Sequence, residues 1–405
     1  MADSIGVDGE WDPNHKGSLH GVRVLDMSRL VAGNALTHVL ADHGAEVIKV
    51  ERPGRGDDLR NWKTEGHATH WKVYCRNKRS VTLDYRAEGA NELFLKLVKT
   101  AHALVENFKP GTLEKMGLGA DVLHKINPKL VIVRISGWGQ DGMWSHKPGF
   151  GSLVEAMGGY ASVSGFSDRP PLLPPTALAD MIAGLYGSMA VMAAIRHVEV
   201  EGGNGQIIDL PLLDAIHSVL GPLAANYALT GQEPERIGSL SDQTAPRNVY
   251  QCRDGKHVAL SASMQAMAER LFRAMGQPEL IDDPRFRTNS DRVAHKEELD
   301  AIVANFMASH DQKDLLDLFE REDVTVGPVV GIAEFVQHPY VHDRRVVLNM
   351  PDEDAGQIPM HHVVARMSDT PGGMIRQAPA LGQDNDQIWR SIGEDPDYLR
   401  SKGVI

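Results

Sequence analysis

Short apolar runs alternate with helical stretches from Val22 onward, and this alternation constrains the fold more than any other feature of the chain. Apolar runs at 22–25 and 46–50 flank a helix-like segment at 35–43. Further short apolar runs follow at 80–83, 103–105 and 130–135, with helical stretches at about 88–100 and 121–126 between them. Strands that alternate with helices are typical of a parallel sheet covered on both faces. The sequence therefore predicts a Rossmann-like, doubly wound α/β domain.

The chain is expected to form two domains, because its 405 residues exceed the usual size of a single hydrophobic core. Residues 226–335 differ in character: a hairpin is predicted to turn at Asp254-Gly255, and charged amphipathic helices follow it. We expect a small α+β domain there, inserted into a large discontinuous domain that residues 18–225 begin and residues 336–405 complete. Residues 1–17 are polar and predict a flexible tail.

Charge and composition disfavour several classes of partner. The formal net charge is −12, whereas a broad nucleic-acid or anionic-membrane surface needs an excess of positive charge. No uninterrupted apolar run is as long as a membrane span, and we expect neither a signal peptide nor an anchor. The two cysteines, Cys75 and Cys252, predict buried thiols, and the spacing of the histidines predicts no metal site. We therefore expect a cytoplasmic protein.

The first strand–helix–strand unit raises the possibility of a dinucleotide cofactor. Glu51 ends the second strand, where a ribose-binding acid would stand in such a fold. The connecting loop, residues 28–34, holds the single glycine Gly33 in place of the G-x-G-x-x-G pattern that lets the backbone approach a pyrophosphate. A nicotinamide or flavin cofactor is therefore not expected.

One carboxylate, Asp180, stands in an apolar stretch. It follows two prolines and Thr176 at the start of residues 177–200, which predict a long helix with Thr176 as its N-cap. Free N–H groups and the helix dipole in the first turn would keep the acid ionised at neutral pH, as a carboxylate nucleophile requires. The same position suits an aspartate that only stabilises the helix terminus, so this segment leaves both roles open.

Nine short motifs follow one another along the chain from about Gly21. They are VLD at 24–26, LADHGAEVIKVERPG at 40–54, NKRS at 77–80, VENFKPG at 105–111, ISGWG at 135–139, LAD at 178–180, GQIID at 205–209, GPV at 327–329 and APALG at 378–382. In content and order they resemble the class III CoA-transferases, the family that includes formyl-CoA transferase, carnitine CoA-transferase and α-methylacyl-CoA racemase.

This resemblance implies that Asp180 is the catalytic nucleophile. In the family, the aspartate attacks an acyl-CoA thioester, and CoA then passes to a free carboxylic acid through aspartyl anhydride and aspartyl-CoA thioester intermediates. CoA is a substrate, no other cofactor is implied, and the family's range suggests succinyl-CoA or another small dicarboxylyl-CoA as the donor. The resemblance also implies a homodimer whose two chains are interlocked.

The resemblance also implies contacts for CoA, whose phosphates call for cations where strands end. The matching residues are Val31, Ala32, Arg52, Leu83, Arg86, Asn107, Phe108 and Lys147. Arg52 would lie at the nucleotide end, and Leu83 and Phe108 would supply apolar surface. Asn34 replaces the proline that is common in the family's first loop, which leaves the conformation of that loop open.

Three further cations, Arg76, Lys78 and Arg79, would either contact a phosphate or form a solvated strand flank. The sequence leaves both readings open for each of them.

Two alternatives remain beside a transferase: an acyl-CoA racemase or isomerase that exchanges an α-proton, and a non-catalytic CoA-binding protein. The racemase branch pairs its aspartate with a histidine, and the matching residue here is Phe150, which cannot carry a proton. Many transferases have a tyrosine and an acid where Phe150-Gly151 stand. An acidic partner for Asp180 is therefore missing from position 151.

Overall fold

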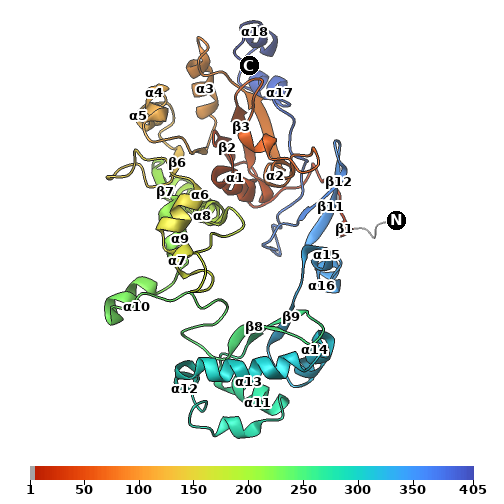
Figure 1. Cartoon of the computed structure of the whole chain (residues 1–405). Helices are drawn as coiled ribbons and strands as arrows, with labels where there is room; N and C mark the ends of the chain where they lie inside the picture. The colour runs from red at the N-terminus through yellow and green to blue at the C-terminus, as the bar shows by residue number, and fades with distance from the viewer. Residues whose placement is uncertain (1–4) are drawn as a thin grey trace. The chain divides into compact units, whose positions relative to one another are not determined.

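Six parallel strands form the central sheet of the larger of two units in the computed structural model, which describes residues 5–405 (Figure 1). The sheet order is β4-β3-β2-β5-β6-β7, with bounds β2 Arg23–Asp26, β3 Glu46–Glu51, β4 Lys78–Thr82, β5 Ala103–Glu106, β6 Val131–Ser136 and β7 Ile207–Pro211. The order reverses between β2 and β5, and ligands of doubly wound sheets bind beyond the carboxyl ends of the strands at such a point. The predicted Rossmann-like α/β fold is confirmed.

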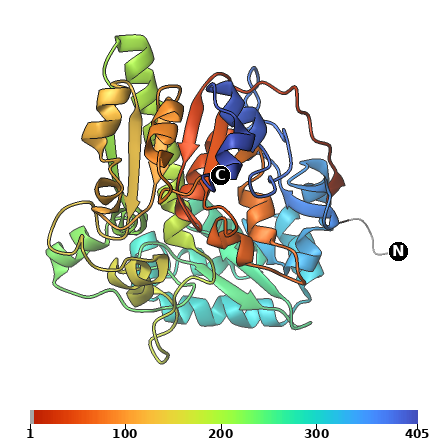
Figure 2. The same ribbon diagram turned by 90° about the horizontal axis from the view of Figure 1, so that it is seen from above.

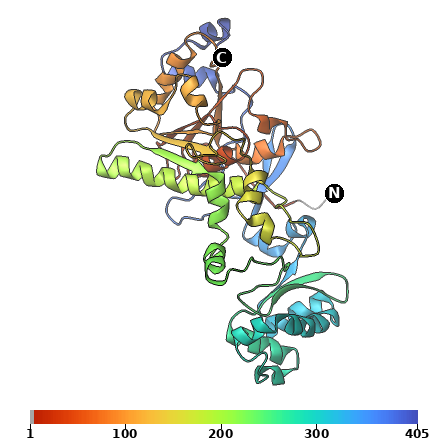
Figure 3. The same ribbon diagram turned by 60° about the vertical axis from the view of Figure 1, so that its left-hand side comes forward.

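Alternate residues of each strand pack on opposite faces of this sheet, because side chains alternate along a strand. Val24 and Val47 join one core cluster, whereas Leu25 and Ile48 join another. Helices α1 (Ala32–Asp42) and α8 (Leu178–Glu201) cover the first face, and Figure 3 shows α8 as the long yellow-green helix beside the sheet. The second cluster takes residues from α3 (Ala90–Val98), α5 (Ala120–Ile126), α17 (Asn385–Ser391) and α18 (Pro396–Ser401).

The C-terminal helices complete this second face. Trp389 on α17 is fully buried in the same cluster as Leu25, and α17 lies next to β4 (Figure 2). Asn385 of α17 also accepts a hydrogen bond from the backbone N–H of Thr82 in β4, which lies 303 residues earlier in the sequence. The C-terminal segment thus fills part of the core of the larger unit.

Close packing of α8 on α1 depends on small residues. A Cβ at Gly184 would lie 2.8 Å from the Cβ of Ala35, and one at Gly187 would lie 2.3 Å from Cδ1 of Leu36. Within residues 5–405, α8 is also the one helix with the length and composition of a membrane span. Its inner side packs against α1, β6 and β7, as the core helix of an α/β domain does.

The N-terminal segment differs from the flexible tail predicted for residues 1–17. Residues 7–8 form β1 (Val7–Asp8), which pairs in parallel with β11 (Val347–Asp352), and β11 pairs antiparallel with β12 (Gly356–His361). The indole Nε1 of Trp11 donates to the carbonyl oxygen of Pro351 at 2.8 Å. Residues 5–17 are therefore bound to the C-terminal part of the chain, and residues 1–4 lie outside the described residues.

Shorter elements connect these parts. They are η1 (Asp58–Asn61), α2 (Thr69–Tyr74), α4 (Thr112–Lys115), α6 (Gly151–Met157), α7 (Tyr160–Val163), α9 (Leu212–Ser218), α10 (Leu223–Thr230), α15 (Ile332–Phe335) and α16 (Pro339–Asp343). The helices α9 and α10 do not form one continuous helix, because Gly221 between them has a φ of 65° and Pro222 follows it.

The smaller unit comprises residues 162–172 and 227–335. Its three-stranded antiparallel sheet has the order β10-β9-β8, with bounds β8 Arg247–Gln251, β9 His257–Ser261 and β10 Val326–Val329. Its helices are α11 (Gln265–Ala274), η2 (Pro278–Ile281), α12 (Asn289–Ala294), α13 (Lys296–Ala308) and α14 (Gln312–Arg321). The β8–β9 hairpin turns at Gly255, with a φ of 80°, as predicted. Phe272 and Phe319 lie in the core of this unit.

Candidate active site

Asp180 lies in the first turn of α8, half-buried, where two helix N-termini meet. The backbone N–H of Ala32, the first residue of α1, donates a hydrogen bond to the Asp180 carboxylate. The N-cap of α8 is Ala177, whose side chain makes no capping hydrogen bond, so the prediction of Thr176 as the cap is wrong. A side chain from another helix takes over that task.

That side chain is Glu155 of α6, which is only 2% exposed. Its Oε1 accepts a hydrogen bond from the backbone N–H of Ala179 at 3.0 Å. Gly151, four residues earlier on the same helix, lies directly against Asp180: a Cβ at Gly151 would be 2.4 Å from Oδ2 of Asp180 and 3.8 Å from Oε1 of Glu155. The missing side chain at position 151 therefore makes room for Asp180, and Glu155 supplies an acid nearby.

Sequence reasoning did not identify Glu155. The available signal was its spacing, since residues i and i+4 of a helix lie on the same face. A glutamate at position 155 can therefore take the place of an acid that is absent from position 151, provided that the segment is helical.

The surroundings of Asp180 raise its pKa. Burial is the largest cause and the negative charge of Glu155 is the second, so that the pKa rises from its ordinary value of 3.8 to about 6, although hydrogen bonds from the backbone N–H groups of Ala32 and Asp180 act in the opposite direction. The carboxyl group is then mostly ionised at pH 7, as a nucleophile must be, and more basic than an exposed aspartate. The helix dipole alone would have predicted a lowered pKa.

The loop between β2 and α1 is held by side-chain amides. Leu30 has a φ of 61°, and its backbone N–H donates to Oδ1 of Asp57 at 2.9 Å. Asn34 donates from Nδ2 both to the carbonyl oxygen of Leu30, at 2.6 Å, and to Oδ2 of Asp57, at 2.8 Å. Asn107 accepts from the backbone N–H of Arg29 at 2.8 Å and donates to its carbonyl oxygen at 2.7 Å. Asn34, which replaces the family's proline, thus fixes the loop by hydrogen bonds.

Two adjoining cavities open beyond the carboxyl ends of β2 to β6. One has a volume of about 370 Å³ and includes Asn107, Phe108, Lys147 and Phe150 in its lining. The other has a volume of about 290 Å³, and its lining includes Arg52, Leu83, Arg86 and Phe108. Arg29 and Phe108 line both cavities. Six of the eight residues predicted to contact CoA therefore surround one continuous region of the surface.

The other two predicted contacts, Val31 and Ala32, line neither cavity. Val31 is buried in an apolar cluster with Leu59, Trp71 and Cys75. Ala32 donates a hydrogen bond from its backbone N–H to Asp180 and so connects the loop to this carboxylate. The CoA contacts predicted for both residues remain predictions.

The two cavities carry several exposed cations. Arg52, Arg86 and Lys147 are exposed, and Arg29, Arg55 and Lys109 line the same region. Nζ of Lys147 lies 3.7 Å from the ring centroid of Trp144, a distance at which the ring faces attract a cation. A polyanion with an apolar arm matches this combination of positive charge and aromatic surface.

The sequence left open whether Arg76 and Lys78 contact a phosphate or form a solvated strand flank, and neither prediction is correct. Lys78 is fully buried, and its Nζ lies 2.9 Å from Oδ1 of Asn34 and 3.3 Å from Oδ2 of Asp26. Arg76 is also fully buried and pairs with Asp42 at 2.6 Å. Both cations therefore belong to internal ion pairs and are neither phosphate contacts nor a solvated flank. Arg79 is half-buried, and its Nε lies 3.5 Å from Oε1 of Glu46.

Glu51 does not stand free for a ribose either. Its carboxylate accepts hydrogen bonds from Arg60 at 2.8 Å and from Ser80 at 2.6 Å. Both cysteines are buried as predicted, and burial raises the pKa of Cys75 to about 12, so its thiol stays protonated. Among residues 5–405, no group of three or more His, Cys, Asp or Glu side chains is placed to hold a metal ion.

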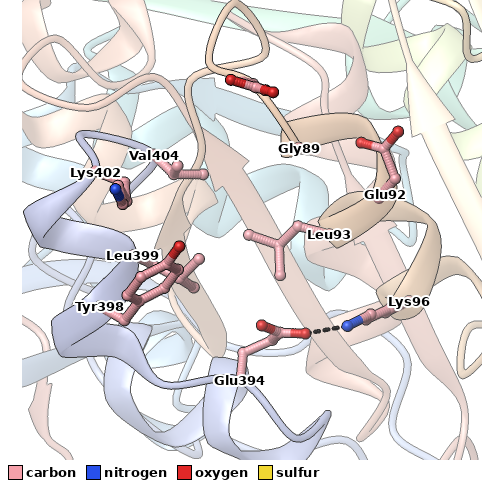
Figure 4. A pocket seen from close by; sticks show the side chains of 10 residues that line it. Gly89, Glu92, Leu93, Lys96, Glu394, Tyr398, Leu399, Lys402 and Val404 are labelled. Carbon is pink, nitrogen blue, oxygen red and sulfur yellow. Dashed lines mark hydrogen bonds and ion pairs between the residues drawn. The ribbon is translucent and has the colours of Figure 1, made fainter.

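Another cavity, of about 510 Å³, lies between α3 and the C-terminal helix (Figure 4). Lys96 and Glu394 form an ion pair across it, and Glu92, Lys402 and Tyr398 also line it. It shares no lining residue with the two cavities at the carboxyl ends of the strands. The acids Glu88, Glu92 and Glu394 outnumber the lysines Lys96 and Lys402 in its lining, so this cavity does not suit a polyanion.

Comparisons with known proteins agree with this geometry. The sequence model of the family described as CoA-transferase family III matches residues 19–385. A succinyl-CoA–D-citramalate CoA-transferase from Chloroflexus aurantiacus is 38% identical over 96% of this chain and 98% of its own length. A succinate–glutarate CoA-transferase from Agrobacterium fabrum is 35% identical over 94% of this chain and 97% of its own. The crystal structure of a CAIB/BAIF family protein from Brucella suis superposes with a TM-score of 0.81 at 32% identity, covering 93% of this chain and 100% of that one.

Proposed function

Because the chain belongs to CoA-transferase family III and is a CoA-transferase, we propose that it moves CoA from succinyl-CoA to a small dicarboxylic acid, with Asp180 as the nucleophile. The observation that carries this proposal is the half-buried carboxylate of Asp180, which lies at two helix N-termini and against Gly151. The residue before Gly151 is Phe150, which lines the larger of the two cationic, aromatic cavities. The relatives named for succinyl-CoA with D-citramalate, and for succinate with glutarate, support the choice of substrates.

The proposed reaction begins when a carboxylate oxygen of Asp180 attacks the carbonyl carbon of the thioester. The carbon–sulfur bond breaks, the CoA thiolate leaves, and a mixed anhydride joins succinate to Asp180. The thiolate then attacks the aspartyl carbonyl carbon, which releases succinate and leaves an aspartyl-CoA thioester. The acceptor carboxylate attacks the carbonyl carbon of this thioester, the carbon–sulfur bond breaks, and a second anhydride forms as the CoA thiolate leaves. The thiolate finally attacks the acceptor's acyl carbon, which gives the new acyl-CoA and frees the Asp180 carboxylate.

Two features of the site favour these steps. A pKa of about 6 gives a carboxylate that is ionised at neutral pH and more basic than an exposed one. The Ala32 N–H, which donates to the carboxylate, would also stabilise the negative charge that develops on the aspartyl oxygen when the thiolate attacks. No metal or redox cofactor is required by this chemistry, since every step is an acyl transfer.

CoA is proposed to lie along the two adjoining cavities. The phosphates would meet Arg52 and Arg86 in the smaller cavity, and the pantetheine arm would pass Phe108 toward the cavity lined by Lys147 and Phe150. Phe150 stands where the racemase branch has a proton-carrying histidine, and it is 63% exposed. This side chain supports a transferase over a racemase, because it cannot exchange an α-proton.

We also propose a cytoplasmic homodimer, interlocked as the family resemblance implies. Its support is the outward side of α8, which exposes Leu185, Tyr186, Met189 and Met192 along one helix. Large exposed apolar patches mark interaction surfaces, and a second copy of the chain is the occupant that we propose. A single-chain mass in sedimentation equilibrium at micromolar concentration would contradict this assembly.

The function is tested by incubating the protein with succinyl-CoA and a panel of dicarboxylic acids and following new thioesters by mass spectrometry. Transfer to at least one acid is expected, with hydroxylamine trapping a hydroxamate on the Asp180 peptide during turnover. Asp180→Asn should abolish transfer while CoA binding persists, whereas Asp141→Asn, which changes an exposed aspartate, should not.

Other outcomes would separate the alternatives. Exchange of an α-deuteron without any acceptor acid would indicate a racemase or isomerase. Binding of CoA with no adduct and no transfer to any acid would indicate a non-catalytic CoA-binding protein. Retained transfer by Asp180→Asn would refute the proposed nucleophile.

A further inference from the structure

We propose that Glu155 is a positioning residue that holds the first turn of α8 and places a second negative charge beside the Asp180 carboxylate, which makes Asp180 a stronger nucleophile. This inference rests on the proposed role of Asp180. It is carried by the geometry of three residues on two helices: Gly151 and Glu155 on α6, and Asp180 on α8.

The hydrogen bond from Ala179 to Glu155 fixes the backbone next to the nucleophile. The N–H of Ala179 is one of the first N–H groups of α8, which have no partner within the helix. A buried carboxylate that accepts this hydrogen bond does the work of an N-cap from a separate helix. Since Ala179 directly precedes Asp180, the bond also fixes the direction from which the Asp180 side chain leaves the helix.

The closeness of the two carboxyl groups follows from Gly151. The Cβ position of this glycine is 2.4 Å from an Asp180 oxygen and 3.8 Å from a Glu155 oxygen, so both groups lie against the same point of α6. Burying a carboxylate is costly unless a cation or several donors compensate. A glutamine would make the same hydrogen bond to Ala179 without that cost, so the folded structure alone gives no reason for the charge.

Other ionisable groups on the elements packed against α8 are engaged elsewhere. On α1, His38 and Asp42 face Arg76. On β6, Arg134 pairs with Glu106 and Glu114, and on β7 Asp209 accepts the backbone N–H of Gln140. On α9, His217 bonds the carbonyl oxygen of Gly158, and Asp214 lies in the first turn of that helix. Among the described residues, Glu155 is the charged side chain that acts on the pKa of Asp180.

A neighbouring negative charge favours the protonated form of Asp180 and increases the basicity of the ionised form. A more basic carboxylate attacks a thioester carbonyl faster, provided that it stays ionised at the working pH, as Brønsted behaviour requires. Beside Glu155, the Asp180 carboxyl group is therefore less ionised below pH 6, and its carboxylate attacks faster above pH 6. Both effects should be measurable in the pH profile of the rate, and a purely structural role of Glu155 would produce neither.

The test is Glu155→Gln, which keeps an oxygen acceptor for Ala179 and removes only the charge. In single-turnover acylation by succinyl-CoA, the acidic limb of the rate profile should move to lower pH by about one unit, and the rate at pH 8 should fall roughly three- to ten-fold. The matched control is Glu199→Gln, which removes an exposed carboxylate near the other end of the same helix and should leave the profile unchanged.

An unchanged acidic limb and unchanged rate in a folded Glu155→Gln protein would overturn the inference, even if its melting temperature shifted. If this variant does not fold, ¹³C NMR of the carboxyl carbons in the wild-type protein decides the matter, with Asp180→Asn used to assign the resonance. A titration of Asp180 near pH 6 that is coupled to a second carboxyl is expected, and a simple titration near pH 4 would overturn the proposal. A failure of the proposed function would look different, because wild-type protein would then transfer no CoA at all.

Discussion

Replacing Gly151 by alanine should displace the carboxylate of Asp180, the proposed nucleophile, without changing any residue predicted to contact CoA. The new Cβ would lie 2.4 Å from Oδ2 of Asp180, a separation below 3.0 Å that real Cβ atoms essentially never show. The backbone of α6 cannot easily yield, because Val154 is fully buried in the core and Glu155 is hydrogen-bonded to Ala179. The Asp180 carboxylate must therefore move.

The size of the effect follows from that distance. Ordinary contact begins at 3.4 Å, so the Asp180 oxygen must retreat by about 1 Å. A misplacement of about 1 Å in a reacting group costs on the order of 100-fold in rate, because the attack geometry is lost. Helix propensity acts the other way on stability, since alanine is favoured over glycine within a helix by about 1 kcal/mol. We therefore expect a folded protein whose kcat is roughly 100-fold lower.

The assay is steady-state CoA transfer from succinyl-CoA, with the KM for succinyl-CoA and the melting temperature measured in parallel. Gly151 lines neither cavity, so KM should change little. Gly331→Ala is the matched control, because a Cβ at Gly331 meets nothing within 4 Å and the backbone there is not left-handed. Wild-type kcat in a folded Gly151→Ala protein would refute the argument that this glycine exists to seat Asp180.

Two further changes test the site from other directions. The pKa of Asp180 is raised to about 6 in the folded protein, so the contribution of this carboxyl group to stability is complete below pH 3.8 and is lost as the pH rises through about 6. Asp180→Asn should therefore stabilise the fold above pH 7 by up to about 3 kcal/mol. Denaturant unfolding at pH 4 and pH 8 should show the difference only at pH 8, and an equal difference at both pH values would contradict this prediction. Asn107→Ala removes two hydrogen bonds that hold Arg29, each worth about 1 kcal/mol. Calorimetry should then show CoA binding weakened by up to about 30-fold, and unchanged affinity would show that the loop keeps its conformation without these bonds.

Most of the sheet was predictable because its signal is local. The strands β2, β3, β5 and β6 each contain a short buried apolar run, and such runs are visible in the sequence without knowledge of their partners. The N-terminal segment was not predictable in this way. Strand β1 is two residues long, and it is held by β11, about 340 residues later, and by the bond from Trp11 to Pro351. A polar segment carries no sequence signal that it will pair with so distant a strand.

The cations show where prediction from the sequence fails at the site. Arg52 and Arg86 follow the ends of β3 and β4 and are exposed in the lining of one cavity, and their predicted contact with CoA remains a prediction. Arg76 and Lys78 have the same chemistry and a similar spacing from a strand, yet both are fully buried in ion pairs with Asp42 and Asp26. A cation in a sequence carries no sign of whether an acid on a neighbouring element will neutralise it. That pairing is a tertiary property.

Glu155, the acid beside Asp180, shows the same limit of prediction from the sequence, and here the limit concerns the proposed chemistry. Read position by position, the sequence indicates that Asp180 lacks an acidic partner, because position 151 is a glycine. On the folded α6, however, Glu155 lies one turn further along the same face and reaches the first turn of α8, while the glycine leaves the space that Asp180 occupies. The two residues are therefore coupled: a side chain at 151 would expel Asp180 from the place where Glu155 acts on it. A helix can therefore place a negative charge at the same point beside Asp180 from either of two positions in the sequence.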